Sequence, residues 1–382
     1  MKGSVIVLGG GVGGVIAANL LRKRLPAEYT VTLIDREENH VFAPSLLWLM
    51  TGDREAAAIS RPLHNLREKG IEVVHGDIEH IDAENHTVLV NGQSISGDYL
   101  IVALGAALAP EDVPGLNTGY SFYDLKEAER LRQQISTFHT GHVVVLTVSP
   151  VYKCPAAPYE AAMLFSHYFQ TQGKRSQIRI SFYAAEAGPL AVAGENVTEA
   201  VRQMLQERDI AYHPQHVIQT IDASTHTLHF ANGVQDSYDL LVYVPAHKPP
   251  RVIRESGLLG QNGWVEVDRH TLETKVPGVY AIGDVTGIPL EMGKPLPKAG
   301  VFAHGQAKVV ANNIACQITG KGRLVQFDGH GECFVEIGDH KAGFAHGDFY
   351  ASPSPVVKVA RPGVRWHLGK VAFEKNWFRA WF

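Results

Sequence analysis

One cysteine of this chain stands in a setting that favours thiolate chemistry. Cys154 follows Lys153 and precedes Pro155, where a helical pattern over residues 156–170 begins. Proline favours the first turn of a helix, and a helix N-terminus or a neighbouring ammonium group lowers the pKa of a thiol. We therefore expect Cys154 to form a reactive thiolate. The alternative is a half-buried cysteine that serves only packing.

Glycines close to the N-terminus form a second pattern. Gly9, Gly11 and Gly14 fit G-x-G-x-x-G between an apolar strand, Ser4–Leu8, and a helical pattern, Val12–Leu25. The first glycine permits a tight turn, the second lets the backbone approach a pyrophosphate, and the third lets the helix pack closely. The helix N-terminus then faces the negative charge. This pattern predicts a dinucleotide-binding loop.

An acidic residue supports the same prediction. Asp35 follows the next strand, Tyr29–Ile34, about 20 residues beyond the last glycine, where a carboxylate accepts hydrogen bonds from ribose hydroxyls. Arg36 beside it is a further candidate for cofactor binding. A strand, a helix and a second strand thus open a parallel sheet.

Two later segments indicate that the dinucleotide is FAD. Thr274–Asp284 resembles the second FAD fingerprint of flavoproteins with two dinucleotide-binding folds, which implies that Asp284, next to Gly283, contacts the ribityl chain. Asp98–Gly105, which contains Ala103, resembles the strand that leads between the two domains of such proteins. Because three fingerprints occur in the expected order, we predict FAD as the cofactor.

The corresponding loop for a second nucleotide is missing. In flavoproteins with two dinucleotide-binding folds that use NAD(P)H, a second glycine-rich loop follows the first strand of the second domain. Here that strand is Val143–Val148, and residues 149–155 after it contain two prolines and a tyrosine but no glycine. A pyrophosphate cannot approach such a backbone closely. We therefore do not expect a nicotinamide nucleotide as the electron donor.

Three motifs carry a more specific resemblance. They are the Cys-Pro-x-x-Pro-Tyr-Glu run that starts at Cys154 (in full Cys-Pro-Ala-Ala-Pro-Tyr-Glu), the strand end Leu240–His247, and Leu296-Pro-Lys-Ala-Gly300. Together they resemble the sulfide:quinone oxidoreductases and the flavoprotein subunit of flavocytochrome c sulfide dehydrogenases, over Val5 to about Gly338. The resemblance implies that Cys154 and Cys333 flank the flavin as a redox-active pair.

The resemblance also implies a reaction. Sulfide would attack the disulfide of the pair, giving a persulfide on one cysteine and a thiolate on the other. The electrons would pass through FAD to a quinone, with persulfide, polysulfide or sulfur as product. Glu160 is the candidate acid/base, and Lys298 would bind the cofactor and stabilise negative charge on the reduced flavin. A surface carboxylate and a solvated lysine are the respective alternatives.

One departure from the family pattern limits this interpretation. Many sulfide:quinone oxidoreductases carry a third essential cysteine after the Pro-Gly-Leu turn, here Pro114–Leu116. The matching stretch Gly119–Asp124 has none, and we interpret Cys316 as structural. This pattern is closer to flavocytochrome c subunits and to some subtypes of the quinone enzymes, so sulfur-chain growth and the sulfur acceptor are left open.

Three other functions compete with this one. A sulfide dehydrogenase subunit that donates to a cytochrome is disfavoured by the lack of a C-x-x-C-H motif, although a partner chain could carry the haem. An NAD(P)H:quinone reductase is the second alternative. The third is an FAD-binding interaction module without catalysis, which would hold the two cysteines far from the flavin.

The elements that position these residues predict an α/β fold. We expect two Rossmann-like dinucleotide-binding domains and a small C-terminal domain. Residues 1–112 and 240–320 would form the FAD-binding domain, 113–239 the second domain, and 321–382 the C-terminal one. The hairpin segments Asn85–Val90 and Thr225–Phe230, each followed by an Asn-Gly turn, indicate two related halves.

The composition excludes several classes of protein. The chain has 382 residues and a net charge of -4 without a basic stripe, so we expect no nucleic-acid partner. No apolar run is long enough to span a membrane, and no room for a signal peptide precedes the first strand. We expect a protein of the cytoplasm or of the cytoplasmic face of a membrane, and a homo-oligomer is compatible with this. Three histidine pairs with metal-like spacing lack completing ligands, so we expect no metal.

Aromatic residues repeat near the C-terminus. If the segment is helical, Phe373, Trp377 and Trp381 form one stripe. Such a stripe is most often core or a dimer contact, but it could also bind a membrane surface weakly or line a quinone entrance. His247 and His304 are candidate neighbours of the flavin or quinone, with ordinary hydrogen-bonded histidines as the alternative.

Overall fold

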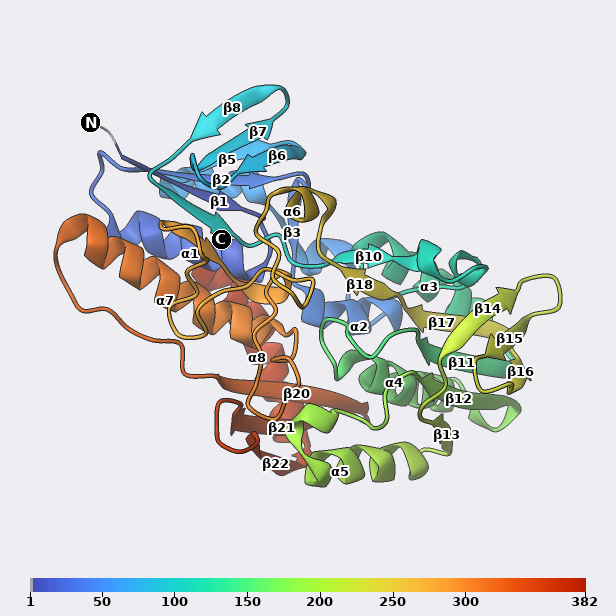
Figure 1. Ribbon diagram of the computed structural model, residues 1–382. Coiled ribbons are helices and arrows are strands. Elements are labelled where there is room, and N and C mark those ends of the chain that lie inside the picture. The colour runs from blue at the N-terminus through green and yellow to red at the C-terminus, as the bar shows by residue number, and fades with distance from the viewer. Residues whose placement is uncertain (1–2) are drawn as a thin grey trace.

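The computed structural model describes residues 3–382 and contains two parallel sheets (Figure 1). The first sheet is built from short apolar runs, and its five strands pair in parallel register. Parallel strands buried on both faces are expected to be nearly all apolar. In spatial order the strands are β19 (Val279–Ala281), β9 (Tyr99–Val102), β1 (Ser4–Leu8), β2 (Thr30–Asp35) and β5 (Glu72–His75).

Two different layers cover the faces of this sheet. Val5 and Val7 of β1 pack under two adjacent helices, α1 (Val12–Arg24) and α7 (Gly300–Thr319). Ile6 and Leu8 point the other way, because side chains alternate along a strand. They pack under an antiparallel sheet of β6 (Ile78–Asp82), β7 (Thr87–Val90) and β8 (Gln93–Ser96), against which α6 (Arg251–Glu255) also lies.

The second sheet repeats this plan. Its strands, in spatial order, are β13 (Ile210–His213), β12 (Ile178–Ala184), β11 (Gly141–Thr147) and β17 (Leu240–Val244). One face packs on α3 (Leu125–Thr137), α4 (Ala157–Thr171) and α5 (Glu195–Gln206). The other face packs under β14 (Ile218–Asp222), β15 (Thr227–Phe230) and β16 (Gln235–Ser237).

The two halves therefore have the same layers, which confirms the predicted fold class of two Rossmann-like units. One predicted boundary needs adjustment. β17 pairs with β11 in the second sheet, although we had assigned residues from 240 onward to the FAD-binding unit. We now place the return crossing after Val244. There β18 (Ala246–Lys248) pairs with β10 (Ala107–Ala109) as a two-stranded connection between the halves.

A shorter segment follows β2 and lies next to the glycine loop. It contains β3 (Asn39–Val41), which pairs with β4 (Ser60–Pro62), and α2 (Leu46–Met50). A short 3₁₀ turn, Ala43–Ser45, joins β3 to α2.

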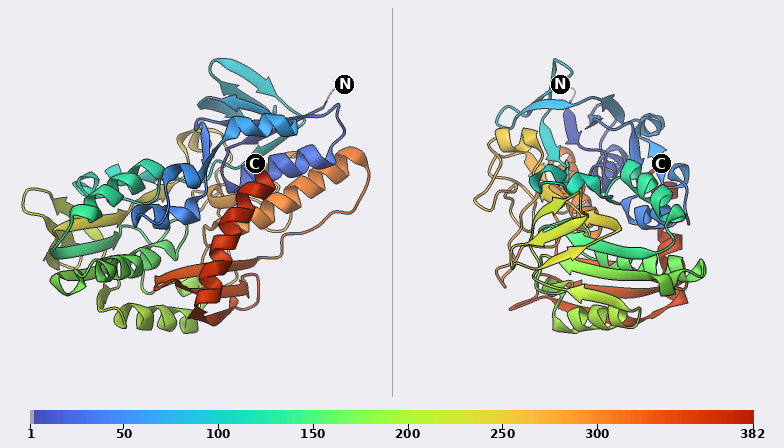
Figure 2. Two further views of the ribbon diagram at one scale, coloured as in Figure 1. Left: turned by 180° about the vertical axis from the view of Figure 1, so that it is seen from behind. Right: turned by 90° about the vertical axis from the view of Figure 1, so that its right-hand side faces the viewer.

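The C-terminal part is an antiparallel sheet and one long helix. The strands are β20 (His330–Gly338), β21 (Lys341–Asp348) and β22 (Val356–Gly363), and β20 packs on α4. Helix α8 (Val364–Trp381) then runs from this sheet back to α1, as seen from behind in Figure 2. The sequence predicted helical periodicity only over the last dozen residues. The first two turns were not predicted because their apolar residues, Val364, Trp366 and Leu368, alternate as in a strand, and Gly369 follows them.

Candidate active site

The glycine loop between β1 and α1 is held closely on one side and open on the other. Gly9 has φ +104°, and a Cβ there would collide with the carbonyl oxygen of Ala103. A Cβ at Gly14 would collide with the carbonyl oxygen of Gly9. By contrast, a Cβ at Gly11 would meet nothing within 4 Å. Since no side chain caps α1 at Gly11, its first amides face this open space.

Asp35 lies against this loop at the end of β2. Its Oδ2 accepts a hydrogen bond from Gly10 N, and its Oδ1 accepts one from Glu37 N at 2.7 Å. Burial raises the pKa of the Asp35 carboxyl, and the two amide donors oppose this shift. Arg36 points to the surface, where its side chain is 71% exposed and pairs with Glu37. Gly105 has φ +65° and also borders open space.

A second group of residues surrounds the start of α7. Gly283, with φ +76°, donates its N–H to Gln306 Oε1 at 2.7 Å. Desolvation raises the pKa of the neighbouring Asp284 carboxyl, and the charges of Lys153 and Lys298 oppose this. Gly283, Asp284, Lys298 and Gln306 line one small cavity together with Thr286 and Phe302.

Lys298 is buried, so the alternative of a solvated lysine is wrong. The side chain is 8% exposed and donates to the carbonyl oxygens of Asp284 at 2.7 Å and Thr286 at 3.0 Å. Its ammonium also lies 3.3 Å from the ring centroid of Trp264. Burial lowers the pKa of Lys298 to about 8, and Asp284 opposes the shift.

Cys154 lies in a turn before α4, with the backbone in the left-handed region at φ +52°. Its N–H donates to Lys298 O at 2.6 Å, which connects the cysteine to the residues around Asp284. Burial, and then the charge of Glu160, raise the pKa of the Cys154 thiol to about 12. The expectation of a lowered pKa for the Cys154 thiol is therefore wrong. The helix begins only at Ala157, and burial lowers the pKa of the Lys153 ammonium that we had expected to stabilise a thiolate.

Cys333, on β20, comes close enough to Cys154 for the two thiols to interact electrostatically. Water reaches its side chain, but protein surrounds the sulfur on most sides. The resulting desolvation raises the pKa of the Cys333 thiol, and the charges of Cys154 and Glu160 raise it further. Both cysteines are free thiols in this structure. Two residues separated widely in sequence thus lie close to each other, because β20 packs on α4.

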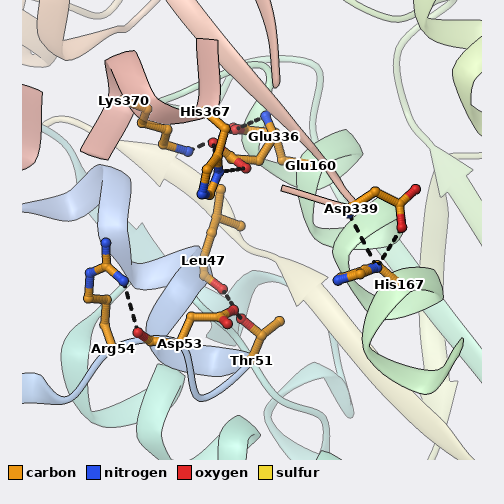
Figure 3. A network of polar contacts seen from close by, with 10 residues as sticks. All are labelled: Leu47, Thr51, Asp53, Arg54, Glu160, His167, Glu336, Asp339, His367 and Lys370. Carbon is orange, nitrogen blue, oxygen red and sulfur yellow. Dashed lines mark hydrogen bonds and ion pairs between the residues drawn. The ribbon is translucent and has the colours of Figure 1, made fainter. Parts of the chain in front are cut away.

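A buried ionic network joins α4, β20 and α8 (Figure 3). Glu160 on α4 is 2% exposed, so it is not a surface carboxylate. Its Oε1 accepts hydrogen bonds from Lys370 Nζ at 3.1 Å and from the backbone N of Glu336 at 2.8 Å. The Glu336 carboxylate in turn lies 3.0 Å from His367 Nδ1.

Burial raises the pKa of Glu160, although the Lys370 ammonium opposes the shift. For Lys370 the two neighbouring carboxylates outweigh desolvation, so its pKa is raised and it stays charged. Sequence reasoning missed Lys370, Glu336 and His367. Lys370 lies on α8 only one turn before Phe373, and nothing local distinguishes it from the exposed Lys375.

Comparison with known proteins gives the family. The model of the pyridine nucleotide-disulphide oxidoreductases matches residues 3–149 and 159–307. The chain belongs to this family. The mitochondrial sulfide:quinone oxidoreductase of Mus musculus is 25% identical over 371 residues, which cover 91% of this chain and 79% of that protein. The sulfide-quinone reductase of Aquifex aeolicus is 27% identical over 393 residues, covering 98% and 90%.

A solved structure agrees with these relatives. The sulfide:quinone oxidoreductase from Aquifex aeolicus superposes with a TM-score of 0.90 at 25% identity, covering 99% of this chain and 91% of that one. The resemblance predicted from the three motifs is thereby confirmed. As a member of the pyridine nucleotide-disulphide oxidoreductase family, the chain is an FAD-dependent oxidoreductase.

The residues present fit FAD. The free amides at Gly11 suit the pyrophosphate, Asp35 suits the ribose, and the segment of Asp284 suits the ribityl chain. Two buried imidazole nitrogens, Nε2 of His247 and of His304, have no hydrogen-bond partner within residues 3–382. Buried polar atoms are normally paired. The described residues leave one nitrogen of each ring without a partner, so both atoms are free to accept from or donate to a bound molecule.

The second half of this pyridine nucleotide-disulphide oxidoreductase does not offer an equivalent loop. Glu186 lies two residues beyond the end of β12, much as Asp35 forms the end of β2. Its carboxylate accepts hydrogen bonds from the hydroxyls of Thr147, Tyr152 and Tyr159, the first and last at 2.7 Å. Three hydroxyl groups of the protein therefore occupy the Glu186 carboxylate, which corresponds to the carboxylate that would bind a ribose in the first half.

Two further observations concern metals and membranes. Among residues 3–382, no group of three histidine, cysteine, aspartate or glutamate side chains is arranged to hold a metal ion. No helix in that same part of the chain is both long and apolar enough to span a membrane. In the C-terminal stripe, Trp377 is 3% exposed and packs inward, whereas Phe373 is 40% exposed.

Proposed function

We propose that this chain oxidises sulfide at a Cys154/Cys333 pair and passes the electrons through FAD to a quinone. The observation that carries the proposal is the proximity of the two thiols, on elements that pack against each other, together with the buried pair of Glu160 and Lys370. The names of the relatives, sulfide:quinone oxidoreductase and sulfide-quinone reductase, support the same substrates. The occupied Glu186 position argues against a nicotinamide nucleotide as donor.

The first step uses the pair in its disulfide form. The sulfur of HS⁻ forms a bond to one cysteine sulfur while the S–S bond breaks, which leaves a persulfide and a thiolate. Cys333 is the more accessible of the two, so we assign the attack to it and the thiolate to Cys154. Cys154 is the cysteine whose backbone connects to Lys298 and Asp284, at the end that fits the flavin.

Proton handling follows from the electrostatics of the pocket. A buried thiolate at Cys154 is costly because desolvation raises its pKa to about 12. Glu160, whose own pKa is raised, is suited to accept the proton that the persulfide releases. Lys370 stabilises the carboxylate between transfers. The deprotonated persulfide and the Cys154 thiolate can then join through a new S–S bond as a trisulfide, which releases two electrons, and FAD, when bound, would accept these electrons and pass them to a quinone.

Exposed apolar residues on α8 are compatible with the uptake of a quinone from a membrane. Leu368 and Phe373 are exposed by 58% and 40%, and they share this helix with the buried Lys370. This arrangement supports peripheral contact with a membrane, from which a lipid-soluble quinone would be taken up. Cosedimentation with anionic vesicles should fall when both residues are changed to serine. Unchanged cosedimentation would contradict the membrane contact but not the sulfide chemistry.

Anaerobic spectroscopy tests the reaction directly. Sulfide should bleach the flavin absorbance of the wild-type holoprotein, and NADH should not. Cys154→Ala and Cys333→Ser should each abolish bleaching, whereas Cys316→Ser should leave it intact because Cys316 lies on α7 and contacts Asn312 and Arg323. Bleaching that persists in Cys154→Ala would overturn the proposal, and rapid reduction by NADH would favour an NAD(P)H:quinone reductase.

A further inference from the structure

A buried chain of hydrogen bonds joins the C-terminal helix to the glycine loop. Trp377 Nε1 donates to His40 Nε2 at 3.0 Å, although the two residues lie 337 positions apart. His40 Nδ1 lies 2.9 Å from the carbonyl oxygen of Gly10. Trp377 is 3% exposed and His40 is 2% exposed. Gly10 lies inside the G-x-G-x-x-G pattern, between its first and second glycines.

The partners of His40 determine its protonation. An indole nitrogen can only donate, so Nε2 of His40 must carry a lone pair. A carbonyl oxygen can only accept, so Nδ1 must carry the hydrogen. The imidazole is therefore neutral, with a single tautomer. Burial lowers the pKa of His40 to about 4, and the ring is enclosed by the rings of Trp377 and Phe382.

The Gly10 peptide is fixed from the other side as well. Its N–H donates to Asp35 Oδ2, and a Cβ at Gly10 would collide with Leu63. Two directed hydrogen bonds thus set the orientation of the loop, one from Asp35 and one from His40. At Gly11, where the cofactor fits, a Cβ would meet no atom of residues 3–382 within 4 Å, so this side of the loop is open.

Helix α8 is itself anchored over the segment that carries His40. The ring of Phe42 packs against Phe373, Trp377 and Phe378 at centroid distances of 5.5 to 6.0 Å. One turn before Trp377, the buried Glu374 carboxylate accepts hydrogen bonds from Ser45 Oγ at 2.6 Å and Arg54 Nε at 2.9 Å. Trp377 therefore presents its N–H to His40 from a fixed position.

We propose that α8 positions the FAD-binding loop through Trp377 and His40. Trp377 selects the tautomer and orientation of His40, and His40 holds the Gly10 peptide in the geometry that the pyrophosphate requires. Both are positioning residues, since they act through Gly10. The inference depends on FAD binding and is independent of which donor and acceptor the enzyme uses.

Trp377→Phe is the most selective test. The phenyl ring keeps most of the packing but removes the donor, which leaves a buried acceptor on His40 unpaired. The dissociation constant of FAD should rise about tenfold. It is measured by the recovery of flavin fluorescence when the holoprotein is diluted. The matched control is Trp381→Phe, one turn later on α8, which should change FAD affinity less than about twofold.

His40→Phe removes both hydrogen bonds and should weaken FAD binding at least as much. The double variant should be no weaker than His40→Phe alone, because the two residues act in one chain. Nitrogen-15 NMR of the wild-type holoprotein should show His40 protonated at Nδ1 only, down to a pH of about 4.

A merely structural role gives a different outcome. It would lower the melting temperature of the apoprotein in Trp377→Phe and leave FAD affinity equal to that of the Trp381→Phe control. That result, or a His40 protonated at Nε2, would overturn the proposal. If His40→Phe does not fold, Trp377→Phe and the NMR measurement still decide the question.

Discussion

The two halves of the molecule begin with the same strand, helix and strand but use the turn between them differently. In the first half the acidic residue, Asp35, pairs with Gly10, and the loop is open at Gly11. In the second half the acidic residue, Glu186, pairs with three hydroxyls, including that of Tyr152. One scaffold therefore presents backbone amides in one half and a thiol, Cys154, in the other.

The difference shows how a nucleotide site can be lost without loss of the fold. Buried hydroxyls and carboxylates each need a partner, and in the second half they satisfy one another. In the first half no side chain caps the first amides of α1, so a ligand can supply their partner. We expect the first half to gain stability from FAD and the second half to be complete without a cofactor.

Gly14→Ala should have the largest effect of the substitutions that test the difference between the two halves. A Cβ there collides with the carbonyl oxygen of Gly9, so the loop cannot keep its shape. FAD affinity should fall at least about 100-fold, measured from the flavin content of the purified protein. At the matching helix start of the second half, Ala156→Gly should leave flavin content unchanged. Full flavin content in Gly14→Ala would show that the loop does not require the glycine.

Lys370→Met tests the buried charges of the thiol pocket. Removing one partner of a buried pair should cost about 3–5 kcal/mol in the free energy of unfolding, measured by urea denaturation. Burial already holds the pKa of Glu160 above 4.5, and loss of the ammonium raises it further. A raised carboxyl pKa favours the folded state only while the group is protonated. The stability lost in Lys370→Met should therefore grow as the pH rises above about 4.5 through the folded-state pKa of Glu160.

The exposed Lys375→Met on the same helix is the control for Lys370 and should cost less than about 0.5 kcal/mol. Equal effects of the two substitutions, or a loss for Lys370→Met that does not depend on pH, would contradict the assigned ion pair.

Glu186→Ala tests whether the buried polar groups of the second half are paired with one another and need no cofactor. The hydroxyls of Tyr152 and Tyr159 would lose their common acceptor, and the free energy of unfolding should fall by about 2 kcal/mol. FAD affinity should stay unchanged, and NADH should still fail to reduce the flavin. Glu195→Ala, at an exposed ion pair, should have no measurable effect. A gain of NADH reactivity would show that Glu186 alone blocks a functional nucleotide site.

Glu160→Gln should have the smallest effect, on the reactivity of the thiol. The charge of Glu160 raises the pKa of Cys154, so its removal should lower that pKa and increase the thiolate fraction at a given pH. Alkylation of Cys154 by iodoacetamide, followed by mass spectrometry, should accelerate about threefold. Glu129→Gln on the surface of α3 is the control. Slower alkylation in Glu160→Gln would contradict the electrostatic assignment.

The sequence predicted the features that depend on local spacing. Gly9, Gly11, Gly14 and Asp35 lie within one strand–helix–strand unit, so their arrangement follows from the fold. The proximity of Cys154 and Cys333 came only from the family resemblance, because no spacing relates a residue in the turn before α4 to one on β20.

Contacts between distant segments could not be predicted. Lys370 meets Glu160 and Trp377 meets His40 across 210 and 337 positions, and neither residue has a local signature. The prediction of a lowered pKa for Cys154 was wrong for the same reason. It depends on desolvation by elements packed around the turn, and a pattern along the chain contains no measure of burial.

The crossing of the chain between its halves has a mechanical consequence. β10 and β18 form one antiparallel ribbon, and a third route runs from α1 through α8 and β20 to α4. The two halves also touch directly, because α2 of the first half packs on α3 and α4 of the second. Helix α8 therefore adds a second contact between the halves, and both contacts oppose rotation about the ribbon. Cleavage of the chain at residues 363–364 should lower the melting temperature of the holoprotein without separating the halves into two heat transitions, because the α2 contact persists.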